Sequence, residues 1–229
     1  MCKNAKGLFV TGTDTGVGKT RVAALIARAL AADDLRVGVY KPAESGCTRQ
    51  EDHVVANDAV ALWEAAGRPG DLEHVCPQRF VAPLAPHLAA RAGGRQLDPE
   101  LMRCGIDFWN ERSDVIVVEG AGGLMSPLGD DDYVADLAHE FGFPLVIVSA
   151  NRLGTINQTL QTLIAAASFR DGLSLAGIVL NNPVAPDDDP STATNRRELE
   201  ARCGPPVLGE LEFDATELDT TVDWLALAR

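Results

Sequence analysis

The sequence lacks any pair of cysteines spaced as Cys-x-x-Cys, and its five cysteines are odd in number and widely scattered. This distribution argues against a disulfide framework and against a zinc site. It is typical of reduced thiols, so we expect a cytoplasmic protein. The cysteines are Cys2, Cys47, Cys76, Cys104 and Cys203.

Long apolar runs are absent as well. No segment approaches the length that a membrane-spanning helix needs. The chain opens without the basic region and apolar stretch of a signal peptide, because the apolar run at 7–11 has only the length of a strand. We therefore expect no membrane partner.

Positive charge is scarce. Lys and Arg number 20 against 33 Asp and Glu, which gives a formal net charge of -13 and a pI of about 4.6. Such a surface repels polyanions, so we expect neither nucleic acid nor an anionic membrane surface as the main partner. A small anion can still be held by a local positive pocket.

Short apolar runs rich in Val and Ile alternate with segments of helical pattern along the chain. This alternation predicts a parallel sheet flanked by helices, in one α/β domain covering residues 1–229. The predicted strands are 7–12, 36–41, 114–120, 144–151 and 175–182. The predicted helices are 20–32, 58–66, 99–111, 133–141, 156–169 and 196–203.

Residues 10–20, VTGTDTGVGKT, follow the first predicted strand and precede the first predicted helix. A P-loop has four residues between its outer glycines, whereas this stretch has five, so only its second half matches. Gly16 and Gly18 permit positive φ angles and a close approach of backbone N–H groups to a polyphosphate. The motif predicts that Lys19 reaches the outer phosphates and that Thr20 places its hydroxyl on Mg²⁺. We therefore expect a mononucleotide-binding fold of the P-loop NTPase type.

Asp14 distinguishes this loop from that of partition and division-site ATPases. Those proteins read KGGVGKT, and their first lysine reaches the partner's nucleotide across a dimer. Aligned on GVGKT, that position is Asp14 here, and an aspartate cannot supply a cation. An enzyme that transfers a phosphoryl group to a small molecule is therefore favoured. A nucleotide-dependent switch that acts through partner binding remains the alternative.

Further polar residues follow the predicted strands. Lys41 and Ser45, in YKPAESG, come after the second strand, where an ammonium and a hydroxyl suit a carboxylate or carbamate. Glu119, in VEGAGG, and Asp58, in ANDAVAL, are candidate Mg²⁺ ligands together with Thr20. A solvated lysine at a strand end and an aspartate that stabilises its own helix start are the structural alternatives for Lys41 and Asp58.

The blocks GTDTGVGKT, KPAESG, NDA, PLAPHLAA, VEGAGG, LGTIN and GIVLNN occur in this order, and with them the chain resembles the dethiobiotin synthetase family over residues 10–182. The resemblance implies a homodimer that closes the ureido ring of dethiobiotin from 7,8-diaminopelargonate, CO2 and Mg-ATP. One substrate amine takes up CO2 as a carbamate, and a carbamate oxygen attacks the γ-phosphate. The other amine then attacks the mixed anhydride and expels phosphate.

The resemblance also implies roles for individual residues. Those expected to bind ATP or its Mg²⁺ are Gly16, Val17, Gly18, Lys19, Thr20, Arg21, Asp58, Glu119, Gly120, Ala121, Gly122, Asn181 and Asn182. Those expected to bind the substrate or act on it are Thr15, Lys19, Lys41, Ser45, Gly122, Gly123 and Asn157. Within these sets, the two lysines are expected to stabilise developing charge. Asn157 is expected to hold the substrate's distal carboxylate across the dimer, and Asn181 to bond adenine.

The chain departs from the family pattern near its C-terminus. There the family often has a proline after LG-x-[IL], and this chain reads LGELEFD, with Glu212 in place of the proline. Glu212, Phe213 and Asp214 are thus assigned to the base pocket by analogy. A carboxylate accepts a hydrogen bond from an exocyclic amine or faces water, so both outcomes stay open. A related ATP-dependent ligase or kinase acting on another diamine or carboxylate also stays open.

Overall fold

A computed structural model describes residues 5–51, 53–185 and 189–229. Six parallel strands form its central sheet in the order β10-β9-β8-β1-β7-β2. Most of their side chains are buried on both faces, which explains the Val- and Ile-rich runs. The strands are β1 (Lys6–Gly12), β2 (Val37–Tyr40), β7 (Val115–Gly123), β8 (Leu145–Ala150), β9 (Leu175–Asn181) and β10 (Val207–Leu211). The predicted parallel α/β fold is confirmed.

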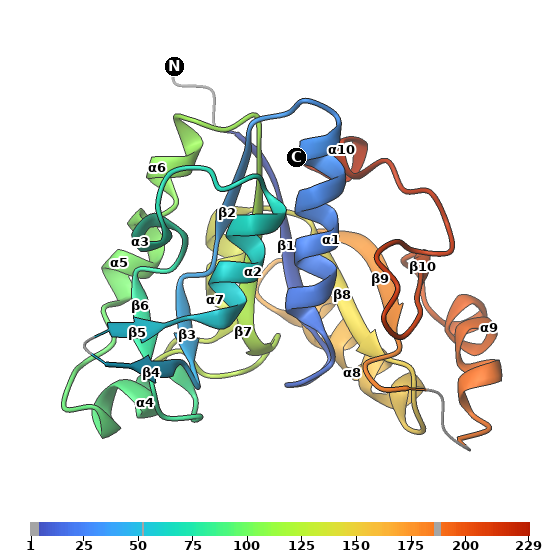
Figure 1. Ribbon diagram of the computed structural model, residues 1–229. Helices are drawn as coiled ribbons and strands as arrows, with labels where there is room; N and C mark the ends of the chain where they lie inside the picture. The colour runs from blue at the N-terminus through green and yellow to red at the C-terminus, as the bar shows by residue number, and fades with distance from the viewer. Residues whose placement is uncertain (1–4, 52, 186–188) are drawn as a thin grey trace.

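Helices cover the sheet, with α1 and α2 in front of it and α8 behind it in Figure 1. The helix α1 packs on β1 and β7, and α2 packs on α1 and β2. The longer helices are α1 (Lys19–Ala32), α2 (Asn57–Ala65), α7 (Val134–Phe141), α8 (Thr155–Ser168) and α9 (Thr192–Arg202). Within the described ranges, none of the helices combines the length and the apolar character needed to cross a bilayer.

The strand order places a topological switch point at β1. Its neighbours are β7 on one side and β8 on the other. The chain places β2 and β7 on one side of β1, and then β8, β9 and β10 on the other side. In such sheets ligands bind in the crevice beyond the carboxyl ends of the strands. The C-terminus lies at the opposite edge, because Gly7 at the start of β1 donates its N–H to the carbonyl of Arg229 at 2.9 Å.

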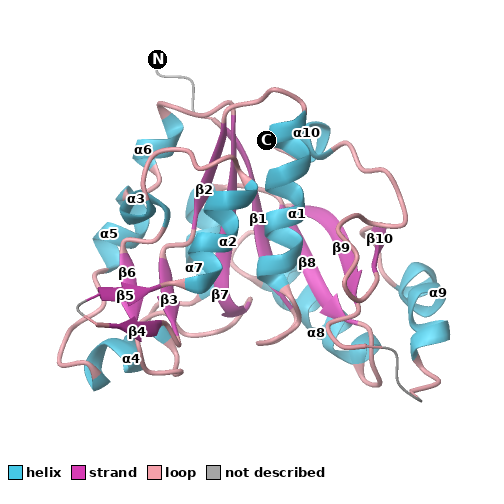
Figure 2. Ribbon diagram, in the orientation of Figure 1, coloured by secondary structure: helices cyan, strands magenta, loops and turns pink. Residues whose placement is uncertain are grey.

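The excursion between β2 and β7 contains structure that the sequence patterns did not predict (Figure 2). Two small sheets form there, a parallel pair and an antiparallel hairpin. Their strands are β3 (Ala43–Ser45), β6 (Gln78–Phe80), β4 (Thr48–Gln50) and β5 (His53–Val55), and short helices α3 (Leu72–Val75) and α4 (Pro86–Ala92) accompany them. Runs of three residues are too short to show a period.

The helix predicted over 99–111 divides into α5 (Pro99–Cys104) and α6 (Asp107–Asn110). The hydroxyl of Tyr40 on β2 donates to the carbonyls of Leu101 and Met102 at 3.1 and 2.9 Å. These carbonyls near the end of α5 therefore have a partner outside the helix, and that of Leu101 also accepts from the N–H of Gly105 at 3.0 Å.

The C-terminal region also differs from the prediction. No strand was expected at β10, whose Gly209 interrupts a short apolar run, and no helix at α10 (Trp224–Leu227). The helix α9 begins four residues before the predicted start at 196. Of the cysteines, Cys47, Cys76, Cys104 and Cys203 are free, and Cys2 lies outside the described residues.

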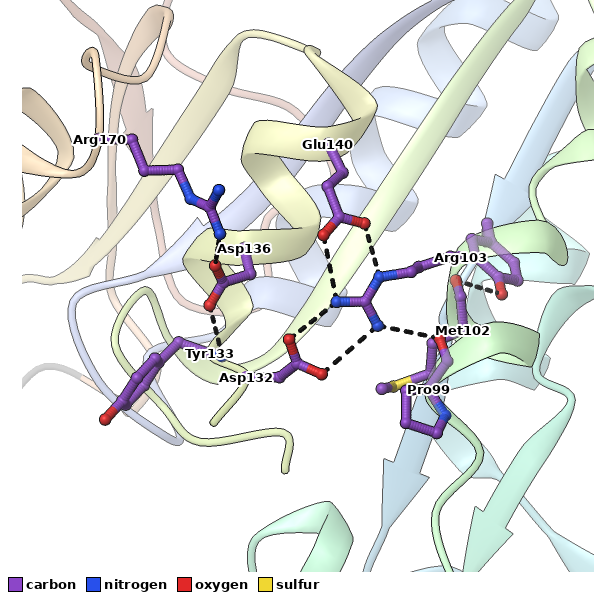
Figure 3. A network of polar contacts seen from close by, with 9 residues as sticks. Pro99, Met102, Arg103, Asp132, Tyr133, Asp136, Glu140 and Arg170 are labelled. Carbon is purple, nitrogen blue, oxygen red and sulfur yellow. Dashed lines mark hydrogen bonds and ion pairs between the residues drawn. The ribbon is translucent and has the colours of Figure 1, made fainter. Parts of the chain in front are cut away.

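Ion pairs fasten the loop that follows β7, as Figure 3 shows. Arg103 on α5 donates to Asp132 of this loop at 2.8 Å and to Glu140 of α7 at 2.7 Å. Asp136 accepts from the backbone N–H of Tyr133 at 2.9 Å and from Arg170 at 2.5 Å. The loop between β7 and α7 is thus tied to α5 through Asp132, and the start of α7 is tied to Arg170 through Asp136.

Candidate active site

The P-loop joins β1 to α1 at the switch point. Gly16 and Gly18 have φ angles of 75° and 94°, which confirms the predicted left-handed conformation at both positions. Gly18 precedes the first turn of α1, so the N–H groups of that turn face the space beyond the carboxyl ends of the strands. Lys19 lies over the loop, and its ammonium donates to the carbonyl of Asp14 at 3.1 Å.

A buried ion pair adjoins this loop. The ammonium of Lys41, just beyond β2, lies 2.6 Å from Oε1 of Glu119 on β7 and 3.2 Å from Oδ2 of Asp58 on α2. Thr20 donates its hydroxyl to the same Oε1 of Glu119 at 2.9 Å. Four side chains from β7, α1, α2 and the end of β2 therefore meet at one point.

The two lysines differ in their electrostatic surroundings. Burial lowers the pKa of Lys19 below its ordinary value, and the nearby carboxylates only partly offset this effect. Burial by itself would also lower the pKa of Lys41, but the carboxylates of Glu119 and Asp58 outweigh it and hold that pKa above its ordinary value. Lys41 is therefore a fixed cation, whereas Lys19 lacks a close carboxylate partner among the described residues.

Glu44 stabilises the helix turn that carries Asp58 of this cluster. Its carboxylate accepts from the backbone N–H groups of Asp58 at 3.1 Å and Ala59 at 2.9 Å, and only 5% of the residue is exposed. These N–H groups belong to the first turn of α2. Glu44 therefore caps this helix, although it lies well before it in the sequence. Asp58 thus lies in the first turn, as its alternative interpretation expected, yet its side chain contacts Lys41. The sequence analysis missed Glu44, although it lies between Lys41 and Ser45 in the same motif.

These residues surround a cavity of about 300 Å³. It brings together most of the residues expected at the phosphates, the metal and the reacting end of the substrate. They are Thr15, Gly16, Gly18, Lys19, Thr20, Lys41, Ser45, Asp58, Glu119, Ala121 and Gly122, with Ala43 and Glu44 in addition.

Three other predicted residues of this region do not line the cavity. Val17 and Gly120 are buried. Gly120 packs so closely that a Cβ there would come within 2.8 Å of Val134. Gly123 donates its N–H to the hydroxyl of Ser126 at 2.8 Å.

Oε2 of Glu119 is buried and has no hydrogen-bond partner among the described residues. A buried carboxylate oxygen is seldom left unpaired, because its desolvation is not offset. Together with the Thr20 hydroxyl and the half-exposed carboxylate of Asp58, it is a hard oxygen donor of the kind that Mg²⁺ prefers. The donor set therefore fits this ion.

A second cavity of about 480 Å³ lies beyond the ends of β8, β9 and β10. Asn182 and Glu212 line it, and Asn182 donates to the carboxylates of Glu210 at 2.8 Å and Glu212 at 3.3 Å. Asn151, also missed by the sequence analysis, donates to Glu210 at 2.8 Å. Phe213 and Asp214 are exposed on the loop after β10.

Asn181, at the end of β9, connects the region of the second cavity to the P-loop. It is fully buried, and its amide donates to the carbonyl of Val17 at 2.8 Å and accepts from Arg21 at 3.2 Å. It packs against Gly18, where a Cβ would approach the amide nitrogen to 2.1 Å. Asn157 lies apart from both cavities, exposed on the first turn of α8.

Comparisons with known proteins show which family the chain is similar to. Residues 6–218 match a family described as AAA domain. A protein of Anaeromyxobacter dehalogenans named ATP-dependent dethiobiotin synthetase BioD is 46% identical over 194 residues, which cover 85% of this chain and 84% of that protein. The proteins of the same name from Rhodopirellula baltica and Bacillus subtilis are 41% and 38% identical; each alignment covers 89% of this chain, with 82% and 86% of the relative.

Solved structures share the fold at low identity. A ParA family ATPase from Chlorobium tepidum superposes with a TM-score of 0.55 at 18% identity, covering 93% of this chain and 85% of that one. The signal recognition particle receptor FtsY of Elizabethkingia anophelis gives 0.51 at 16% identity, with 95% of this chain but 63% of that chain covered. These likenesses concern the fold alone, whereas the sequence identities over most of the chain show that it belongs to the dethiobiotin synthetase family.

Proposed function

We propose that this chain catalyses the ATP-dependent closure of the ureido ring of dethiobiotin from 7,8-diaminopelargonate and CO2, in biotin biosynthesis. The relatives named ATP-dependent dethiobiotin synthetase support this reaction and ATP as its co-substrate. The observation that carries the proposal is the cavity in which Lys19 and Lys41 meet the P-loop and the strand-end hydroxyls.

The chain's own part in the reaction is placement and charge stabilisation. The N–H groups of the P-loop and the first turn of α1 bind the triphosphate, and Lys19 faces its outer end. Thr15 and Ser45 hold the carbamate by their hydroxyls. Lys41, kept cationic by its carboxylates, faces the negative charge that develops as the carbamate oxygen attacks the γ-phosphate.

Thr20, Asp58 and Glu119 would hold Mg²⁺ in this site. The unpaired Oε2 of Glu119 supports that assignment. The ion would neutralise charge on the phosphate oxygens.

We further propose a homodimer in the cytoplasm, in which Asn157 of one protomer holds the distal carboxylate of a substrate bound to its partner. The exposed apolar residues Leu153 and Ile164, 80% and 65% exposed, flank Asn157 on and before α8 and support an interface there. A monomeric mass by light scattering at micromolar concentration would contradict the dimer.

Asn181, Asn182 and the segment 212–214 are assigned to the nucleotide base, on the side of the second cavity. The alternative of a partition-type switch is not favoured, because Asp14 stands where the switch needs its lysine and the relatives are named as synthetases. A kinase or ligase with another acceptor differs only in its product.

The decisive experiment supplies purified protein with diaminopelargonate, bicarbonate and Mg-ATP and identifies the product by mass spectrometry. We expect dethiobiotin, and we expect ATP hydrolysis to need both the diamine and CO2, because the attacking oxygen exists only in their carbamate. Equal hydrolysis without the diamine would refute the assignment. Omitting each component in turn provides the control.

A further inference from the structure

Arg21 follows the P-loop threonine in the first turn of α1, yet its side chain does not line the phosphate cavity. Its guanidinium reaches the ends of β9 and β10. There Nη1 donates to Oδ1 of Asn181 at 3.2 Å and to the carbonyl of Asn182 at 3.3 Å. Nη2 donates to the carbonyl of Ala215 at 2.7 Å and to that of Glu212. One side chain therefore contacts four oxygens on two separate segments.

The loop after β10 is bound by this contact at two of its carbonyls. Glu212, Phe213 and Asp214 are all exposed, and Asp214 has a left-handed φ of 57°, which is uncommon for a residue with a side chain. Two carbonyls of the loop, of Glu212 and Ala215, turn inward to the same guanidinium. The guanidinium thereby holds the turn closed against the end of β9.

The same contact continues to the P-loop. Asn181 accepts from Arg21 with its amide oxygen and donates with its amide nitrogen to the carbonyl of Val17. The loop after β10, the end of β9 and the P-loop are thus joined through Arg21 and Asn181. A displacement of the guanidinium would leave the loop after β10 attached to the end of β9, among the described residues, only through Asn182, which donates to Leu211 and Glu212.

The acceptors of Arg21 are neutral. Three are backbone carbonyls and one is an amide oxygen, and among the residues that the structure describes no carboxylate forms an ion pair with it. A planar guanidinium with several fixed N–H groups can serve such a set at once, whereas a lysine ammonium has no fork that spans two segments. The arrangement therefore suits a positioning role that depends on shape.

We propose that Arg21 is a positioning residue for the nucleotide base: its side chain fixes the loop 212–215 beside the end of β9 and takes no part in binding the phosphates. The inference rests on the proposed function for the location of the base. The family resemblance implies that Arg21 helps to wrap the triphosphate, and the proposal limits that role to its backbone. Its consequence is that base affinity and phosphate affinity can be separated by one substitution.

The test measures dissociation constants of Mg-ATP and of Mg-tripolyphosphate, which has no base, by calorimetry. We expect Arg21→Met to raise the dissociation constant of Mg-ATP by about tenfold. The dissociation constant of Mg-tripolyphosphate should stay within about twofold of the wild-type value. In turnover, the loss should appear in KM for ATP and leave kcat at saturating ATP near wild type. Arg28, which is exposed on the same helix, provides the matched control. Arg28→Met should change the dissociation constant of neither ligand.

Equal weakening of both ligands would assign Arg21 to the phosphates and overturn the proposal. Unchanged affinity for both would show that the loop does not depend on Arg21, which also overturns it. If Arg21→Met does not fold, Arg21→Lys decides by the same comparison, since it keeps the charge and loses the fork. A wild type that binds Mg-ATP but makes no dethiobiotin would refute the proposed function and leave this inference standing.

Discussion

Nζ of Lys41 lies 2.6 Å from Oε1 of Glu119, and both side chains are buried. The pair joins the end of β2 to its neighbour β7 at the edge of the sheet where the cavity opens. Removal of one partner from a buried pair leaves an uncompensated charge in a medium that solvates it poorly. This relationship makes Lys41 important for stability as well as for chemistry.

We therefore expect Lys41→Met and Lys19→Met to differ. Both should abolish most turnover, because each removes a cation from the phosphoryl-transfer site. Lys41→Met should also lower the free energy of unfolding by about 3 kcal/mol, since Glu119 loses its partner. Lys19→Met should cost little, because burial disfavours the Lys19 charge and its bonded acceptor is a neutral carbonyl. Urea denaturation measures both, and equal stability losses would contradict the distinction.

Substitution of Thr20 tests the metal assignment while keeping both charges of the Lys41–Glu119 pair, although it removes one hydrogen bond to Glu119. Thr20→Val removes the hydroxyl and keeps the shape of the side chain, so the Mg²⁺ concentration for half-maximal turnover should rise by about tenfold or more. Thr20→Ser retains the hydroxyl and should titrate like wild type. Asp58→Asn should give a smaller rise, because this carboxylate is 45% exposed and its amide still offers an oxygen. A Thr20→Val titration identical to wild type would remove the residue from the metal site.

Glu44 should behave as a structural support of the site. Glu44→Ala leaves two N–H groups of α2 without their acceptor, which should lower the free energy of unfolding by about 1–2 kcal/mol. Turnover should fall as well, because Asp58 is displaced from Lys41. Glu44→Gln keeps one acceptor oxygen and should lose less of both. The hypothesis fails if Glu44→Ala is as stable as wild type in denaturant.

The central strands were predictable because each is an apolar run of strand length between helix-like segments. The run at 115–118 is an example, since its Val and Ile side chains are buried on both faces and need no alternation. β10 was not predictable in this way, because it lies at the edge of the sheet and its five residues include Gly209 and Glu210. β3 and β6 pair across more than thirty residues of chain, a contact that no local pattern encodes.

The residues of the candidate site also divide into those that the sequence predicted and those that it did not. Residues of the P-loop and of VEGAGG were found because the phosphate chemistry imposes glycine, lysine and carboxylate in a fixed local order. Glu44 was missed because its function is to accept backbone N–H groups fourteen and fifteen residues away. The side-chain direction of Arg21 was not predictable either, since its acceptors lie at and beyond the ends of β9 and β10, which only the folded sheet brings to α1.

Thiol reactivity offers a test of the packing. Burial raises the pKa of Cys47 to about 11 and that of Cys76 to about 12, so that at pH 8 only about 0.1% or less of either is thiolate. Cys104 is exposed and should be alkylated first. Peptide mass spectrometry after timed iodoacetamide treatment measures each site, with urea-unfolded protein as the control. Equal labelling of Cys76 and Cys104 in the native protein would contradict the packing.

The departure at Glu212 predicts an unusual response to the nucleotide base. Its carboxylate is exposed beside the second cavity and accepts from Asn182 at 3.3 Å, so one of its oxygens remains available to a ligand amine. Cytosine and adenine carry an exocyclic amine, whereas uracil presents a carbonyl at that place. We therefore expect CTP to support turnover better than UTP in the wild type, by roughly fivefold for a contact of about 1 kcal/mol.

Glu212→Gln and Glu212→Pro separate the carboxylate from the shape of the loop. The glutamine keeps the size of the side chain and weakens its acceptor, so the difference between CTP and UTP should shrink while ATP turnover stays close to wild type. The proline removes the side-chain acceptor and stiffens the backbone, and it should close the difference fully. Turnover with ATP, CTP, GTP and UTP in the three proteins measures this. A wild type that already treats CTP and UTP alike, with no change in either variant, would mean that Glu212 faces water and that the base is selected elsewhere.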